Sequence, residues 1–175
     1  MNRVYTIGHS NHAPEEFIHL LSSTGIQYVV DVRSEPTSAR FPHVNRSSLE
    51  RSLPPEDIRY LYLGDALGGR PKDPDCYDDT TGKPDYAAIQ RKEWFQAAIG
   101  RLVEGVENGY RIAVMCSEED PSRCHRNLLV GEALRKEGVE VLHIRGDGRV
   151  QTEEDLLKEK AGLPAEQYSL PLGDI

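Results

Sequence analysis

The chain has 175 residues, with 21 Lys and Arg against 29 Asp and Glu, which gives a formal net charge of −8 at pH 7. This length suits one domain, and 38% hydrophobic with 29% charged residues is typical of soluble globular proteins. No apolar run approaches the roughly 20 residues that a membrane-spanning helix needs, and three cysteines, an odd number, exclude a secreted disulfide framework. We therefore expect a cytoplasmic protein without membrane contact. Its acidic balance disfavours binding along duplex nucleic acid.

The first half of the chain alternates predicted strands and helices. Strand-like apolar runs and segments with helical spacing of apolar residues follow one another at 4–8, 14–24, 28–32, 47–53 and 58–63. The first helix has Pro14 at its first position and Gly25 directly after its end, which are residues that helix termini favour. The strand at 28–32 is apolar enough to be buried on both faces of a sheet.

The second half starts with a long segment, residues 64–83, that is rich in Gly, Pro and Asp. Uninterrupted segments of this length tend to be functional or mobile, so we expect a mobile loop with an exposed Cys76. Helices and strands then alternate again, at 84–107, 111–115, 121–136, 139–144 and 153–160. Asp120 is the expected N-cap of the helix that begins at Pro121, and this start places Cys124 in a first helical turn.

Strands joined by helical crossovers predict an α/β fold. We expect three layers around a mostly parallel sheet of five strands, in a single domain over residues 1–162. Residues 163–175, with two prolines and no clear periodicity, are expected to form a tail. Ligands of open parallel sheets bind at the carboxyl ends of the strands, so a functional site is expected there.

Polar side chains follow the predicted strands at these carboxyl ends. His9, Asp31, Arg33 and Cys116 are predicted to lie around one cleft. The candidate catalytic residues are His9, Asp31 and Cys116, and the candidate substrate-binding residues are Ser10, Arg33 and Arg126. Arginines would position negative charge, while His9 and Asp31 would transfer protons. Each position taken alone is also explained by the turn that follows any strand. Their joint occurrence favours a site.

Residues 116–126 are the most informative segment, and three kinds of chemistry fit them. In the first, a transition metal, zinc or iron, is bound by Cys116, Glu118, Cys124 and His125, because thiolate and imidazole suit these ions. In the second, Cys116 is a nucleophile. In the third, both cysteines are packing residues or a reversible disulfide pair. The acidic residues 118–120 would repel an anion and raise a thiol pKa, so metal binding ranks ahead of the nucleophile.

Residues 33–51 carry four arginines and only two acidic residues, Glu35 and Glu50. Such a basic patch would suit a phosphorylated ligand or a nucleic-acid end, with Phe41 stacking on a base. A solvated connection whose arginines pair with acidic neighbours explains the same pattern.

Four motifs occur in order along the chain, at 6–11, 31–38, 67–69 and 116–126. Together they resemble the bacterial and archaeal family catalogued as domain of unknown function 488, over residues 4 to 144. The resemblance implies a compact cytoplasmic α/β domain. It marks as hallmark positions His9, Ser10, Asp31, Arg33, Cys116, Glu118, Cys124, His125 and Arg126. It implies no particular reaction.

These observations lead to two hypotheses of different classes. The first is an enzyme of unassigned reaction that acts on a small anionic or nucleotide-like substrate at the carboxyl edge of the sheet. The second is a non-catalytic module that binds a nucleic-acid end or a protein partner through residues 33–51. Metal in the purified protein would favour the first, and salt-sensitive binding of oligonucleotides without metal would favour the second.

Overall fold

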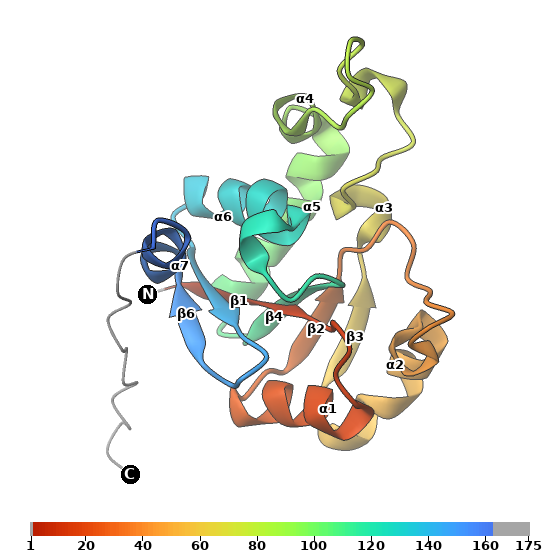
Figure 1. The fold of residues 1–175 in the computed structure, drawn as a ribbon, viewed down its shortest axis with the longest axis vertical. Helices are drawn as coiled ribbons and strands as arrows, with labels where there is room; N and C mark the ends of the chain where they lie inside the picture. Colours follow the sequence, from red (N-terminus) through yellow and green to blue (C-terminus); the bar gives the residue numbers. More distant parts are fainter. Residues whose placement is uncertain (1, 163–175) are drawn as a thin grey trace.

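Six strands form one sheet in the computed structural model, which describes residues 2–162 (Figure 1). The strands are β1 (Arg3–Gly8), β2 (Tyr28–Asp31), β3 (Arg59–Tyr62), β4 (Ile112–Cys116), β5 (Glu140–Ile144) and β6 (Val150–Thr152). Their order across the sheet is β3-β2-β4-β1-β5-β6. The first five run parallel, and β6 is antiparallel to β5. The predicted α/β fold with a mostly parallel sheet is confirmed, while the predicted tail 163–175 lies outside the described residues.

The prediction of five strands is wrong by one, because it omits β6. This strand has only three residues, too few to show an alternating apolar pattern. A tight turn joins it to β5: the Arg145 N–H donates to the Arg149 carbonyl at 2.9 Å, and Gly148 has a positive φ of 86°. The turn, rather than apolar periodicity, therefore brings β6 against β5.

The α-helices are α1 (Pro14–Ser23), α2 (Arg46–Ser52), α3 (Gly64–Leu67), α4 (Tyr86–Gln90), α5 (Glu93–Glu107), α6 (Glu132–Lys136) and α7 (Glu153–Lys160). Two predicted helices are interrupted. The segment 84–107 divides into α4 and α5, and the segment 121–136 contains a 3₁₀ turn, an extended residue and a π-helical stretch before α6. Among the helices of residues 2–162, none combines the length and apolar character that a membrane crossing requires.

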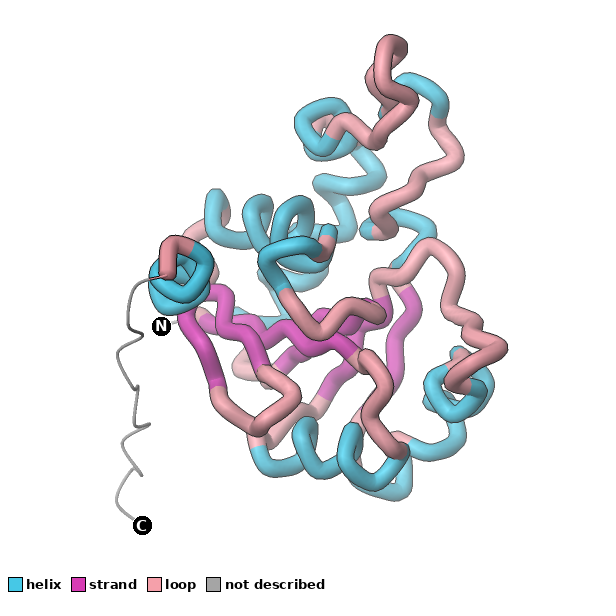
Figure 2. Tube along the Cα trace, in the orientation of Figure 1, coloured by secondary structure: helices cyan, strands magenta, loops and turns pink. Residues whose placement is uncertain are grey.

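Helices cover both faces of the sheet and complete three layers (Figures 1 and 2). The core on the face of α5 and α6 includes Val30, Leu102, Val114, Cys116 and Leu134. The core on the face of α1 and α2 includes Leu21, Val29, Leu49, Ala113 and Met115. Because side chains alternate along a strand, neighbouring residues of β4 belong to opposite cores. Cys116 therefore faces the layer that contains α5 and α6.

Residues 64–83 contain more structure than a loop. They include α3, a 3₁₀ turn at Pro74–Cys76 and a bridge between Tyr77 and Pro84, and with α4 they form the projection at the top of Figure 1. The expectation of an exposed Cys76 is wrong, because this side chain has no exposed surface and belongs to the core of the α5 face. The mobility of the segment stays a prediction.

Gly64 provides a test of how this segment packs. A Cβ at this position would lie 1.9 Å from the Arg33 carbonyl oxygen. We expect Gly64→Ala to lower the free energy of unfolding by about 1–3 kcal/mol, because rigid backbone must shift. Gly100→Ala in α5 is the matched control: a Cβ there meets nothing, and alanine favours a helix, so a gain of about 0.5–1 kcal/mol is expected. Urea unfolding measures both, and equal stabilities would contradict this packing.

Candidate functional site

Polar residues converge at the carboxyl ends of β1, β2 and β4, but from opposite faces of the sheet. Asp31 is in register with Met115, on the α1 face, whereas Cys116 lies on the α5 face. Two backbone hydrogen bonds join the segments beyond β1 and β4: the His9 N–H donates to the Cys116 carbonyl, and the Ser10 N–H donates to the Ser117 carbonyl, both at 2.9 Å. The two groups of side chains therefore meet at the edge itself.

On the α1 face, Asp31 and Arg33 form a buried ion pair. Asp31 Oδ1 accepts from Arg33 Nε at 2.9 Å, and Oδ2 accepts from Arg33 Nη2 at 2.7 Å. The backbone N–H of Arg33 donates to Oδ1 at 3.0 Å, and the Tyr60 hydroxyl donates to Oδ2 at 2.7 Å. Each carboxylate oxygen thus accepts two hydrogen bonds, and Asp31 has no exposed surface. In this geometry the carboxylate holds the Arg33 guanidinium in place.

His9 is held neutral beside Arg33. Its Nδ1 lies 3.0 Å from the Ser10 carbonyl oxygen, which can only accept, so Nδ1 carries the proton. Its Nε2 accepts from Arg33 Nη1 at 3.2 Å. Burial lowers the pKa of His9 to about 4, and the positive charge of Arg33 acts in the same direction. Both ring nitrogens are occupied, which leaves none free for the predicted proton transfer in this arrangement.

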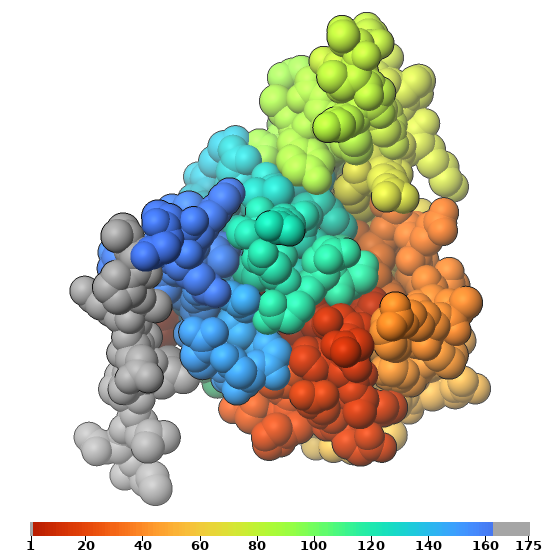
Figure 3. Space-filling view, in the orientation of Figure 1, coloured from red at the N-terminus to blue at the C-terminus, as the bar shows by residue number. Residues whose placement is uncertain are grey.

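A cavity of about 640 Å³ opens at this edge. Its walls come from the residues after β1, the connection after β2 and the residues after β4, which lie side by side in Figure 3. The lining residues are His9, Ser10, Asn11, Arg33, Glu35, Thr37, Ser38, Arg40, Phe41, Ser117 and Glu118. Of the four residues predicted around one cleft, His9 and Arg33 line it, whereas Asp31 and Cys116 are buried and do not. Of the other two substrate-binding candidates, Ser10 lines the cavity and the buried Arg126 does not.

The ionised side chains of the cavity carry both signs. Arg33 forms an ion pair with Asp31, which largely neutralises its positive charge. The Arg40 guanidinium lies 5.3 Å from the centroid of the Phe41 ring, and no ion pair within residues 2–162 involves it. Glu35 and Glu118 add two exposed carboxylates to the lining. The cavity therefore suits a ligand with hydrogen-bond donors as well as an anionic or aromatic group.

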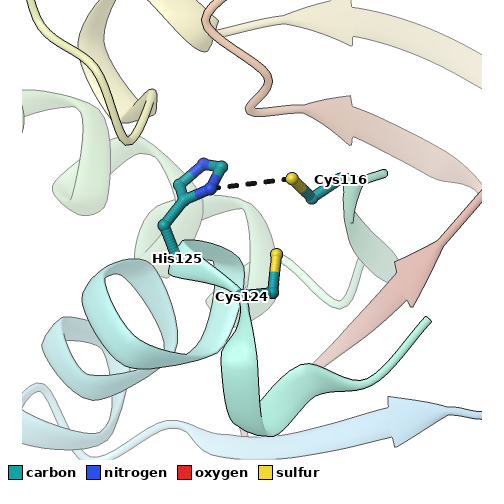
Figure 4. Close-up of side chains that lie close together, drawn as sticks. All are labelled: Cys116, Cys124 and His125. Carbon is teal, nitrogen blue, oxygen red and sulfur yellow. Dashed lines mark hydrogen bonds between the residues drawn. The ribbon is translucent and has the colours of Figure 1, made fainter. Parts of the chain in front are cut away.

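On the α5 face, Cys116, Cys124 and His125 form a second group (Figure 4). Their potential ligand atoms all lie within 4.8 Å of one another, and Cys116 Sγ is 3.6 Å from His125 Nδ1. His125 Nε2 lies 2.9 Å from the Val32 carbonyl oxygen, which can only accept, so Nε2 carries a proton. Nδ1 is the ring nitrogen that lies toward Cys116 Sγ.

The two thiols differ in acidity. A hydrogen bond from Cys124 lowers the pKa of Cys116 to about 7 despite the opposing effect of burial, and the nearby positive charge of Arg126 contributes to the lowering. The same thiol–thiol interaction and burial together raise the pKa of Cys124 to about 12. These opposite shifts favour a Cys116 thiolate near neutral pH, with the Cys124 thiol donating a hydrogen bond to it.

The local fold around Cys124 differs from the prediction. Asp120 does act as a cap, since its Oδ1 accepts from the Ser122 N–H at 2.9 Å, but it caps only the 3₁₀ turn Pro121–Arg123. Cys124 then has extended backbone, with φ −114° and ψ 138°, and the π-helical stretch Arg126–Gly131 follows. The expectation that Cys124 lies in a first helical turn is therefore wrong: Cys124 directly precedes the helical residues, and its carbonyl accepts from the Leu128 N–H at 3.0 Å.

Two glycines let a neighbouring segment close over this group. A Cβ at Gly69 would lie 2.9 Å from His125 Cγ, and a Cβ at Gly68 would lie 2.5 Å from Ser34 Oγ. The Arg70 N–H donates to Ser34 Oγ at 3.0 Å and fixes the segment there. Gly69 is thus required because the backbone packs directly on the imidazole, and Gly68 is required because it packs against Ser34 and the Gly64 carbonyl.

Arg126 is oriented into the protein rather than into the cavity. It has no exposed surface, and it donates to the carbonyl oxygens of Glu118 and Glu119 and, at 3.3 Å, to Thr6 Oγ1. It therefore shapes the turn after β4. Glu118, predicted as a metal ligand, is not in the described Cys/His group, and its side chain lines the cavity instead.

Two further side chains support the site without having been expected there. Tyr60 on β3 binds Asp31, and Thr6 on β1 binds Arg126. Thr6 had a sequence signal, because it is a small polar residue between Tyr5 and Ile7 in the first strand. Tyr60 had none, since a tyrosine in a strand is usually a packing residue.

Comparisons with known proteins give one match. A model of the family described as "Domain of unknown function DUF488" matches residues 13–134, which is more than half of the chain. The matched range includes the Asp31–Arg33 pair, the two glycines and the Cys/His group. No curated protein and no solved structure matches the chain.

The buried neutral His9 predicts how stability depends on pH. Its pKa is about 4 in the fold against an ordinary 6.5, so between these values the unfolded chain binds more protons. Stability should therefore fall as pH drops below 6.5, and His9 should account for about 2 kcal/mol of the loss between pH 7 and pH 5. His9→Asn, which keeps a donor and an acceptor, should remove this share, whereas exposed His19→Asn should not. Urea unfolding at both pH values checks it, and an unchanged pH dependence in His9→Asn would contradict it.

Proposed function

The chain belongs to the family described as domain of unknown function DUF488, and we propose that it is an enzyme whose Cys116, Cys124 and His125 bind a transition metal beside a small-substrate cavity. One distance carries the proposal. Ligands at about 2.3 Å (sulfur) and about 2.1 Å (nitrogen) from a tetrahedral zinc ion lie about 3.6 Å apart. Cys116 Sγ and His125 Nδ1 have this separation, 3.6 Å, and the Cys124 sulfur lies within 4.8 Å of both.

The surroundings of the three side chains fit a metal as well. A metal-binding histidine almost always donates its other ring N–H to an oxygen acceptor, and His125 donates to the Val32 carbonyl. Ligand thiols must be deprotonated, and the lowered pKa of Cys116 reduces that cost. Two thiolates and one imidazole suit zinc or iron and leave a fourth position for water or substrate. Reduced thiols also fit a cytoplasmic protein.

The cavity is the proposed substrate site. Phe41 and Arg40 offer an aromatic and a cationic surface to a base or an anionic group, while Glu35 can accept from sugar hydroxyls. This combination favours a small nucleotide-like substrate over a simple anion. Ser117 and Glu118 bring the same cavity to within one and two residues of Cys116 along the chain.

Each remaining side chain has a distinct proposed role. When bound, the metal would polarise a substrate oxygen or acidify a bound water. Glu118 is the proposed proton acceptor, because it is the acidic residue of the 116–126 motif that lines the cavity. His9 and Asp31 hold Arg33 at the cavity wall, with His9 accepting from Arg33 Nη1 and Asp31 bound bidentately.

Metal analysis tests the proposal. Protein purified with neither added metal nor chelator should contain about one zinc or iron ion per chain. Cys116→Ser, Cys124→Ser and His125→Gln should each lower zinc affinity by more than about 100-fold, since loss of a ligand exceeds loss of its outer-shell partner. Cys76→Ser is the matched control, a buried cysteine outside the group, and should keep the metal.

Two outcomes would contradict the metal site. Wild-type protein that stays metal-free even after zinc is added would exclude it. Equal loss in Cys76→Ser and in the three ligand variants would trace the effect to unfolding instead. Metal-free protein that binds oligonucleotides in a salt-sensitive manner would favour the non-catalytic alternative.

A further inference from the structure

A chain of buried hydrogen bonds runs beneath the turn that follows β4. It links Glu153 on α7, His143 on β5, Thr6 on β1 and Arg126, whose guanidinium binds the carbonyl oxygens of Glu118 and Glu119. We infer that Thr6, His143 and Glu153 are positioning residues, which act through Arg126 to fix the turn that bears Ser117 and Glu118. The consequence for catalysis rests on the proposed function, whereas the effect on the turn does not.

The chain has one consistent direction. Thr6 Oγ1 accepts from Arg126 Nε at 3.3 Å, so its own proton is available to His143 Nδ1, 2.8 Å away. With Nδ1 as acceptor, the neutral ring carries its proton on Nε2 and donates to Glu153 Oε2 at 3.0 Å. A protonated His143 would donate from both nitrogens and leave the Thr6 hydroxyl proton without this acceptor. Burial lowers the pKa of His143, in agreement with a neutral ring.

The polar chain occupies positions that packing alone would fill with apolar side chains. Thr6 and His143 are paired in register on neighbouring strands, and both have no exposed surface. Burying a polar group without a partner costs about 1–3 kcal/mol, so each member needs the next. A valine at position 6 would pack as well as threonine but would leave Arg126 Nε and His143 Nδ1 without partners.

The C-terminal part of the fold also holds the turn by a second route. Glu119 accepts from Arg145 Nε at 2.9 Å, from Arg145 Nη2 at 3.0 Å and from the Gly146 N–H at 3.0 Å. Arg126 thus binds the backbone of the turn after β4, and the β5–β6 turn binds the side chain of Glu119. At the far end of the chain, Glu153 is fixed by Arg135 Nη1 at 3.2 Å.

The consequence concerns two cavity residues. Ser117 and Glu118 are exposed and line the cavity, and no side-chain hydrogen bond to the described protein restrains the Glu118 carboxylate. Its position therefore depends on its backbone, which Arg126 holds. Loss of the buried chain should loosen residues 117–119 while the sheet stays folded.

Amide hydrogen exchange on metal-free protein tests the inference with a matched pair at position 6. Thr6→Val keeps the shape but removes the hydroxyl, and exchange within residues 116–120 should rise about tenfold, as expected for a lost buried hydrogen bond. Thr6→Ser keeps the hydroxyl and should restore slow exchange. A general loss of stability would instead raise exchange throughout β3 and β5. Such a uniform rise, or equal behaviour of the valine and serine variants, would overturn the inference.

A second pair guards against misfolding of the Thr6 variants. Glu153 and Glu154 both lie in the first turn of α7, so Glu153→Ala and Glu154→Ala lose the same favourable charge at the helix start. Only Glu153→Ala should raise exchange within 116–120, and equal effects of the two substitutions would overturn the inference.

Zinc binding by the same proteins separates the two proposals. Local exchange effects without any zinc binding would support the positioning residues and contradict the metal site. Zinc binding without local exchange effects would support the metal site and contradict the positioning residues.

Discussion

A guanidinium group without exposed surface organises this end of the molecule. Arg126 is the largest fully buried side chain among residues 2–162, and its donors bind Thr6 and the carbonyl oxygens of Glu118 and Glu119 rather than a carboxylate. A buried charge is costly unless oxygen atoms or an opposite charge surround it. The turn after β4 must therefore wrap toward Arg126, and Gly8 permits this approach, since a Cβ there would lie 1.8 Å from the Glu118 carbonyl oxygen. The same positive charge favours the Cys116 thiolate.

The two faces of the sheet contribute different chemistry to one edge. The α1 face supplies a rigid Asp31–Arg33–His9 unit in which every acceptor is occupied, so it serves better to orient a ligand than to exchange protons. The α5 face supplies two buried sulfur atoms and a partly buried imidazole, which are the proposed metal ligands. At the carboxyl ends, the segments beyond β1 and β4 are hydrogen-bonded, and the cavity there is lined by His9 and Arg33 and by Ser117, the residue after Cys116. This separation explains why one short sequence motif could not define the site.

Periodicity predicted the alternation of strands and helices and the carboxyl edge at which the cavity opens, because both depend on local apolar spacing and on the rule for parallel sheets. Periodicity failed where contacts between residues far apart in the sequence determine the local structure. Cys76 looks exposed in a Gly- and Pro-rich segment but is drawn into the core, and Cys124 lies before the helix because a 3₁₀ turn intervenes. Tyr60 binds Asp31 from 29 residues away in the chain, and His143 binds Thr6 from 137 residues away, so no local pattern predicts these two contacts.

In the proposed metal site, the sulfur atoms of Cys116 and Cys124 and one imidazole nitrogen of His125 bind the same ion. X-ray absorption spectroscopy of the zinc-loaded protein measures that ligand set directly. We expect a first shell with about two sulfur atoms at about 2.3 Å and nitrogen or oxygen atoms at about 2.0–2.1 Å. The number of sulfur ligands should fall by half in Cys124→Ser and stay unchanged in Cys76→Ser. A shell of nitrogen and oxygen atoms alone, in wild-type protein with one bound zinc ion, would contradict it.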